Sequence, residues 1–190
     1  MTFFLRKNPA LRILLIGSML VHIATAMLGP IYALFVDKVG GSLLDASFAG
    51  TVYAVTAGVM ILFFGNISDN VKHPKYIVVS GYITVGIGFL LYTQVSTIAQ
   101  LIAVQIITGV GEALYSPAFD KLYSEHLDKG KGGAEWGFWE AMYYFAVASG
   151  AFLGGVTVFH YGFNALFIIM TVLCFASALY ILRTAKYVLN

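Results

Sequence analysis

Six apolar runs, each about twenty residues or longer, occupy most of this chain and constrain its fold more than any other feature. A helix that crosses the roughly 30 Å hydrocarbon core of a membrane needs about 20 residues at 1.5 Å each. The mean hydropathy of +0.84 and the charged fraction of 11% are typical of membrane proteins. The sequence therefore predicts an all-α membrane protein in which residues 1–190 form one domain of six transmembrane helices. The predicted spans are about 10–36, 46–66, 75–95, 97–119, 135–157 and 163–182.

The connections between the predicted spans are short, and the longest, about 120–134, is too short to form a domain. Any binding site must therefore be built from the helices themselves. Cys174 is the only cysteine, which excludes an intramolecular disulfide and a cysteine-based zinc site. The phosphate-binding pattern G-x-x-x-x-G-K-[ST] does not occur, which argues against ATP hydrolysis by this chain. We expect no cofactor and no metal.

The basic residues are distributed asymmetrically between the loops. When successive loops are assigned to alternate sides, ten basic residues fall on one side and only Lys38 falls on the other. Loops rich in Lys and Arg stay in the cytoplasm. We therefore expect a multi-pass protein of the plasma (inner) membrane with both termini in the cytoplasm, as an even number of spans requires. The ten residues are Arg6, Lys7, Arg12, Lys72, Lys75, Lys121, Lys129, Lys131, Arg183 and Lys186.

The N-terminal region also resembles a secretory signal. Basic residues precede the run ILLIGSMLV, and Ala24-Thr25-Ala26 has the small residues of a cleavage site. The apolar run continues past that point to Phe35, which is longer than the core of a signal. A first transmembrane span is therefore the favoured interpretation.

An internal repeat relates the two halves of the chain. The segment AMLGP at 26–30 aligns with ALYSP at 113–117 at an offset of 87 residues, and Leu91-Tyr92 aligns with Leu179-Tyr180 at an offset of 88. Three spans repeated once must have opposite orientations in the membrane. The sequence thus predicts a 3+3 inverted repeat, which is the plan of many secondary transporters.

Polar residues recur at spacings of three and four on several predicted helices, so they form stripes on one face. These stripes predict a polar cavity among the first, second, fourth and fifth spans, whereas the third and sixth are expected to face lipid. The alternative is hydrogen bonding between packed helices, which we favour for Thr25, Thr56 and Thr108. The predicted cavity residues are His22, Thr25, Tyr32, Tyr53, Gln105, Thr108, Glu112, Tyr115, Glu140 and Tyr143.

Three segments contain motif-like combinations of small, polar and charged residues. LIAVQIITGVGEA at 101–113 is similar to a motif of the fourth helix in a family of membrane proteins, with Gln105 where an arginine is usual. GAFLGG at 150–155 is similar to the antiporter motif of the fifth helix in the same family, with Ala151 in place of its proline. GNISDNVKHPK at 65–75 keeps the glycine and aspartate of a loop motif. Together they resemble the major facilitator superfamily, and specifically one six-helix half of it. The resemblance implies secondary transport of a small molecule by alternating access.

Small residues within these motifs let helix backbones approach closely where helices slide or rock against one another. Static close packing is the alternative. An aspartate in the loop motif, next to two lysines, is expected to latch one conformation, although a solvated charge cluster would look the same. The residues assigned to conformational gating are Gly65, Asp69, Gly150, Gly154 and Gly155.

Two carboxylates lie within the predicted spans at similar depth, Glu112 about 22 Å from the outer end of its helix and Glu140 near the cytoplasmic end of the next. Arg12 is the nearest intramembrane cation, and a structural ion pair would neutralise one of the two carboxylates. Glu140 is the candidate for this pair, and the alternative is that Glu140 is not paired with Arg12. Glu112 shares a polar stripe with Gln105, so it is expected to line the cavity. There it would bind and release protons or attract a cationic substrate, with His22 as a second site.

One six-helix unit has a single set of cavity faces and nothing opposite to close them. Intramembrane carboxylates that face lipid cost a few kcal/mol each. We therefore expect a parallel homodimer related by a two-fold axis along the membrane normal. A heterodimer with a separate second half is the alternative.

Two other classes of function compete with a proton-coupled secondary transporter. A non-transporting membrane interaction protein or receptor would give no substrate flux. A membrane-embedded hydrolase would need a nucleophile with a nearby base, for which Ser149 and His22 are the available residues. We expect a transporter and not an enzyme.

Overall fold

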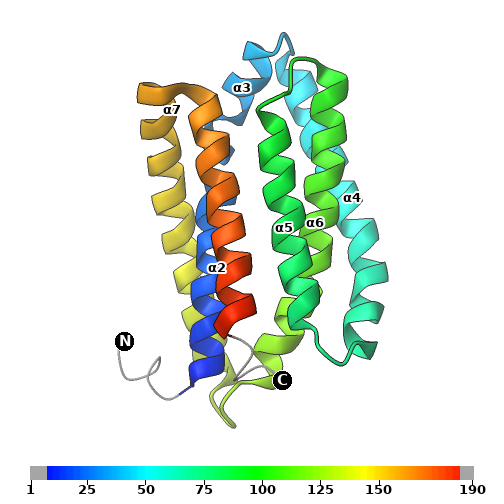
Figure 1. The fold of residues 1–190 in the computed structure, drawn as a ribbon, viewed down its shortest axis with the longest axis vertical. Coiled ribbons are helices and arrows are strands. Elements are labelled where there is room, and N and C mark those ends of the chain that lie inside the picture. Colours follow the sequence, from blue (N-terminus) through cyan, green and yellow to red (C-terminus); the bar gives the residue numbers. More distant parts are fainter. Residues whose placement is uncertain (1–7, 185–190) are drawn as a thin grey trace.

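The computed structural model describes residues 8–184, and within them the chain is a bundle of long helices without strands, as the apolar runs predict (Figure 1). Three of the basic residues counted above, Arg6, Lys7 and Lys186, lie outside the described residues. The elements are α2 (Pro9–Leu28), the 3-10 turn η1 (Gly29–Ile31), α3 (Tyr32–Lys38), α4 (Leu43–Asn70), α5 (Lys75–Tyr92), α6 (Ile98–Glu125) and α7 (Gly132–Thr184).

Five helical stretches of the described chain are long and apolar enough to cross a membrane, whereas six spans were predicted. They are Pro9–Lys38, Leu43–Asn70, Lys75–Tyr92, Ile98–Glu125 and Gly132–Thr184. The count differs because the fifth and sixth predicted spans both lie in α7. Gly162 interrupts the helical dihedrals of α7 with a φ of 77° and a ψ of 176°, a conformation that glycine adopts without steric penalty. Figure 1 shows α7 reversing direction near its middle, so that its yellow and red parts run in opposite directions.

Helix ends follow local capping chemistry. The Asn8 side chain caps α2 by accepting a hydrogen bond from the Leu11 amide at 3.2 Å. Ser42 and Asp45 form a reciprocal capping box at the start of α4, which satisfies two backbone donors that a helix N-terminus otherwise leaves free. These caps fix where α2 and α4 begin, and therefore which residues reach the middle of the bundle.

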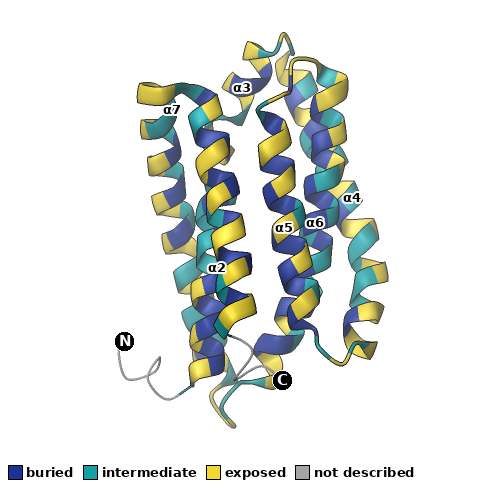
Figure 2. Ribbon diagram, in the orientation of Figure 1, coloured by how far each residue is buried: buried dark blue, intermediate teal, exposed yellow. Residues whose placement is uncertain are grey.

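The helices pack in a chain of neighbours: α2 lies against α7, α7 against α5, α5 against α6, and α6 against α4. Helix α4 is at the edge of this arrangement, and most of its surface is exposed or half-buried (Figure 2). Its buried residues are only Ala46, Ala49, Ala57 and Ser68. The hydrophobic core therefore lies mainly among α2, α5, α6 and α7.

Candidate functional site

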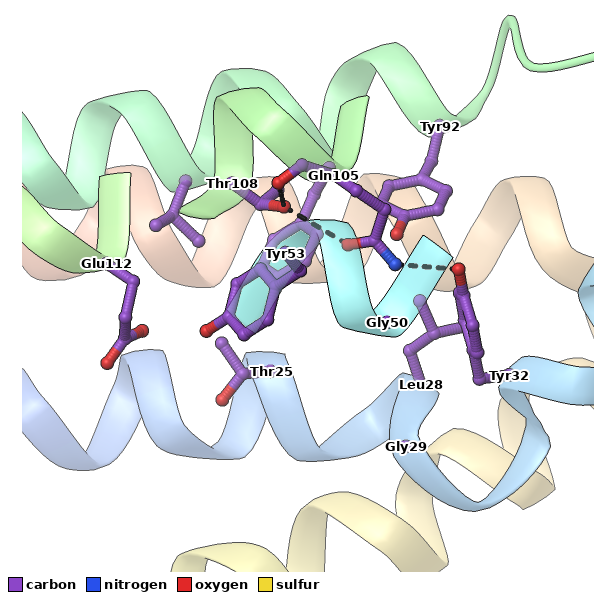
Figure 3. A pocket seen from close by; sticks show the side chains of 12 residues that line it. Thr25, Leu28, Gly29, Tyr32, Gly50, Tyr53, Tyr92, Gln105, Thr108 and Glu112 are labelled. Atoms are coloured by element: carbon purple, nitrogen blue, oxygen red, sulfur yellow. Dashed lines mark hydrogen bonds between the residues drawn. The ribbon is translucent and has the colours of Figure 1, made fainter. Parts of the chain in front are cut away.

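A cavity of about 320 Å³ lies between α2, α4, α5 and α6 (Figure 3). Six of the ten predicted cavity residues line it, which are Thr25, Tyr32, Tyr53, Gln105, Thr108 and Glu112. The other lining residues are Leu28, Gly29, Gly50, Val85, Phe89 and Tyr92. The stripe on α6 faces this space because residues 105, 108 and 112 are three and four apart and so share one face of a helix.

At one end of the cavity, a hydrogen bond joins distant parts of the chain. The Gln105 side-chain amide donates to the Tyr32 hydroxyl oxygen at 2.6 Å, across 73 residues of sequence. Thr108, one turn along α6, donates instead to the Val104 carbonyl of its own helix at 3.0 Å. Thr25 likewise donates to the His22 carbonyl at 3.1 Å. The hydrogen bonds of these two threonines therefore stay within their own helices rather than joining packed helices.

Glu112 lies at the opposite end, with Tyr53 between it and Tyr32 (Figure 3). The Tyr115 hydroxyl donates a hydrogen bond to Glu112 Oε2, and the Tyr53 hydroxyl also interacts with this carboxylate. The two ion pairs within residues 8–184 are Lys121 with Glu125 and Lys131 with Asp128, so neither neutralises Glu112. The Glu112 carboxylate is thus held by hydroxyl groups and has no cationic partner in the described structure.

Four of the predicted cavity residues lie elsewhere. Tyr115 is buried behind the cavity, where its ring packs edge-on against Tyr82 at a centroid distance of 4.9 Å. His22 packs edge-on against Tyr143 at 4.9 Å, in the contact between α2 and α7. Glu140 is exposed on α7. His22, Glu140 and Tyr143 therefore do not line the cavity that Glu112 and Gln105 border, although Tyr143 interacts electrostatically with Tyr53.

The candidate ion pair between Arg12 and Glu140 is not formed. Both side chains are exposed, and neither belongs to an ion pair among the described residues. The candidate pair was wrong because similar depth in a membrane does not place two side chains on facing helix surfaces.

Helix α5 contributes a cavity wall that was not predicted. Val85, Phe89 and Tyr92 line the cavity, although the third predicted span was expected to face lipid. Their spacing of four and three places them on one helix face. Because apolar and aromatic residues are equally suited to lipid and to a cavity wall, this spacing was the only available signal.

The gating glycines differ in what surrounds them. A Cβ atom added at Gly154 would overlap the Met27 backbone, and one added at Gly150 would meet the Ile23 carbonyl oxygen of α2 at 2.5 Å. A Cβ atom at Gly155 or Gly65 would meet nothing within 4 Å. Close helix approach thus accounts for Gly150 and Gly154 alone.

A second cavity of about 440 Å³ lies near the far end of α4 and α6 and includes Gly65 and Asp69 in its lining. Lys121 on α6 donates from Nζ to the carbonyl oxygens of Ser68 and Asp69, at 2.9 and 3.1 Å. These carbonyls belong to the last turn of α4, where a cation is favourable. Asp69 therefore helps to join α4 to α6 through its backbone carbonyl oxygen. Its partner is Lys121 of α6 and not a lysine of the loop that follows α4.

The described residues contain no group of three His, Cys, Asp or Glu side chains that could hold a metal ion.

A bundle of helices long and apolar enough to cross a membrane is typical of integral membrane proteins, and comparison with known proteins gives the family of this chain. The sequence pattern of the Major Facilitator Superfamily matches residues 14–188, and the chain belongs to that family. Its members are transporters and not enzymes, which removes the hydrolase alternative.

Several known proteins are similar to this chain. Multidrug resistance protein MdtG of Proteus mirabilis (strain HI4320) is 23% identical over 182 residues, covering 92% of this chain and 44% of that protein. The chain thus spans less than half the length of that relative. The uncharacterized MFS-type transporter YitZ of Bacillus subtilis (strain 168) is 21% identical over 164 residues, covering 85% of this chain and 98% of YitZ. The crystal structure of the POT family transporter PepTSo superposes with a TM-score of 0.78 at 12% identity, covering 96% of this chain and 38% of that one.

Proposed function

We propose that this chain is the transport unit of a secondary transporter that moves a small molecule by alternating access through the cavity at Glu112. The observation that carries the proposal is an intramembrane carboxylate without a cationic partner, facing a cavity of about 320 Å³ in a protein of this family. Ionisable groups inside membranes are costly and are placed where they bind substrate or ions. The multidrug resistance proteins among its relatives support a small organic substrate.

We further propose that α7 crosses the membrane twice, giving six crossings with both termini in the cytoplasm. The break at Gly162 supports this, since the two parts of α7 on either side of it run in opposite directions (Figure 1). The inverted repeat predicted from the sequence then relates the first three crossings to the last three. A reporter enzyme that works only in the cytoplasm should be active when it is fused after Asn190. Activity of a periplasmic reporter at that position would contradict the proposed orientation.

Glu112 is proposed to couple transport to protons. Its carboxylate is reached from the cavity, and the hydroxyl groups of Tyr115 and Tyr53 hold it in place. A carboxylate can take up a proton on one side of the membrane and release it on the other, whereas an amide cannot. Glu112→Gln should therefore preserve folding and remove the dependence of transport on pH.

The test uses the purified full chain in liposomes, with an imposed pH gradient and three fluorescent dyes, one cationic, one neutral and one anionic. Uptake of at least one dye should follow the pH gradient, and Glu112→Gln should abolish that dependence. Glu140→Gln is the matched control, because Glu140 is exposed and lies outside the cavity. A folded protein that moves no dye would favour the receptor alternative. An unchanged pH profile in Glu112→Gln would reduce this residue to a packing role.

A parallel homodimer is proposed as the assembly that closes the cavity. Helix α4 borders the cavity at Gly50 and Tyr53 and packs closely only on α6 and α3, while large apolar side chains such as Leu62 and Phe63 remain exposed on it. The match to nearly all of YitZ is consistent with a unit of this size. A pair with a separate second half is the rival assembly.

Cross-linking distinguishes these assemblies. Leu62→Cys on α4 should form a disulfide between two copies, whereas Ile87→Cys on the exposed face of α5 should not. The native Cys174 is buried and will not interfere. Monomer alone at every concentration, by cross-linking and by native mass spectrometry, would contradict the homodimer.

A further inference from the structure

We propose that the cavity selects an elongated organic cation that carries a hydrogen-bond acceptor at the end opposite its positive charge. This inference rests on the proposed function, because it takes the cavity at Glu112 as the substrate site. It specifies the ligand from the positions of the two polar ends of the cavity and from the chemistry of its walls.

The Glu112 end requires a cation. The cavity lining contains one carboxylate and no lysine, arginine or histidine, and no ion pair of the described residues includes Glu112. An anion placed there would meet like charge without compensation, and a neutral molecule would give the ionised carboxylate no counter-charge. A buried charge is stabilised mainly by an opposite charge nearby, so a cationic ligand is the complement of this end.

The walls between the two ends are apolar and aromatic. Leu28, Val85 and Phe89 supply apolar contact, and the rings of Tyr53 and Tyr92 also line the space. Aromatic faces attract organic cations and accommodate alkyl groups. The middle of the ligand is therefore expected to be hydrocarbon, because few polar atoms here could replace the water lost from a polar chain.

The Tyr32 end offers a hydrogen-bond donor. The Tyr32 oxygen accepts from the Gln105 amide, and no hydrogen bond of the described residues uses the Tyr32 hydroxyl as a donor. A phenolic hydroxyl can donate and accept at the same time. The Tyr32 hydroxyl can therefore donate a hydrogen bond to a carbonyl or ether oxygen of the ligand.

The separation of the two ends follows from α6. Gln105, which holds the Tyr32 hydroxyl, and Glu112 are seven residues apart on one helix, which corresponds to about 10 Å along its axis. Figure 3 shows Glu112 and Tyr32 at opposite ends of the lining residues. A ligand that contacts both polar ends must therefore extend along α6 rather than sit at one end of the cavity. The cavity volume of about 320 Å³ is at the lower end of the range for small-molecule sites, which favours a slender ligand.

The test measures binding to the purified full chain by calorimetry, independently of transport. The reference probe is an alkyltrimethylammonium ion with a methyl ketone about eight bonds from the nitrogen. Three comparison probes each lack one feature: a neutral analogue with carbon in place of nitrogen, an analogue with CH₂ in place of the carbonyl, and a ketone about four bonds from the nitrogen. The reference should bind about tenfold or more tightly than the neutral analogue, and about fivefold more tightly than the other two.

Two variants assign these preferences to residues. Glu112→Gln should remove the preference for the cation over the neutral analogue, while Glu112→Asp retains it and Glu140→Gln leaves it unchanged. Tyr32→Phe should remove the preference for the ketone and keep the preference for the cation. Thermal unfolding of each variant establishes that it is folded.

Equal binding of the cation and the neutral analogue, or a cation preference that survives Glu112→Gln, would overturn the cationic ligand. Equal binding of the short and long ketones would overturn the requirement for an extended ligand. Cation binding without dye flux in liposomes would overturn the proposed transport function and leave the ligand class intact. Flux of a neutral or anionic dye with no binding of the cation would overturn this inference alone.

Discussion

The α2–α7 contact and the α4–α6 contact differ in how firmly each holds its helices. Gly150 and Gly154 bring α7 against the backbone of α2, and the Ser177 hydroxyl of α7 donates to the Gly17 carbonyl at 2.7 Å. Helix α4 has only four buried residues and is held to α6 by close approach at Gly109 and by Lys121. Since α4 also borders both cavities, we expect α2 with α7 to be the firmly held part of the unit and α4 to be the wall that shifts more easily.

The largest effect is expected from Gly154→Ala. The added Cβ atom would overlap the Met27 backbone, which cannot move without displacing α2. Overpacking of this kind costs about 3 kcal/mol of unfolding free energy, or prevents folding. Gly155→Ala is the matched control, because its Cβ atom would meet nothing within 4 Å. Denaturant unfolding in detergent compares the two, and equal stabilities would show that the α2–α7 contact is not fixed.

A smaller effect is expected from Gly109→Ala. Its Cβ atom would lie 2.9 Å from the Tyr53 carbonyl oxygen of α4, and α4 has few other contacts that resist a shift. We expect a loss of about 2 kcal/mol of unfolding free energy, with displacement of Tyr53 in the cavity. Gly58→Ala on α4, which meets nothing within 4 Å, controls for the helix propensity of alanine. If Gly109→Ala were as damaging as Gly154→Ala, α4 would be as rigidly held as α2.

The smallest effect is expected from Lys121→Met. This change removes two hydrogen bonds to the last turn of α4, at Ser68 and Asp69. Because the lysine is partly exposed, we expect a loss of about 1 kcal/mol that is confined to this turn. Hydrogen exchange should be about fivefold faster at the end of α4 and unchanged in α2, whereas Lys121→Arg should resemble the parent protein. Unchanged hydrogen exchange at the end of α4 would show that the two hydrogen bonds of Lys121 do not stabilise this turn.

The sequence was sufficient for the helices and for one face of the site. Gln105 and Glu112 could be assigned to a cavity because a stripe on one helix depends only on helical period. The partners of that stripe depend on how helices are rotated against each other, which periodicity does not contain. His22 illustrates this, since it belongs to a polar stripe on α2 yet packs against the rings of α7. Phe89 and Tyr92 illustrate the opposite case, because aromatic side chains suit lipid and a ligand equally well.

Each chain contributes one carboxylate to the cavity, and this has an electrical consequence for the proposed cycle. One carboxylate balances one positive charge at a time, either a proton or a monovalent organic cation. A cycle that exchanges one for the other carries no net charge across the membrane. A membrane potential is worth about 2.3 kcal/mol per elementary charge at 100 mV, and this exchange would draw on none of it, so the proton concentration ratio alone would set how far the substrate is concentrated.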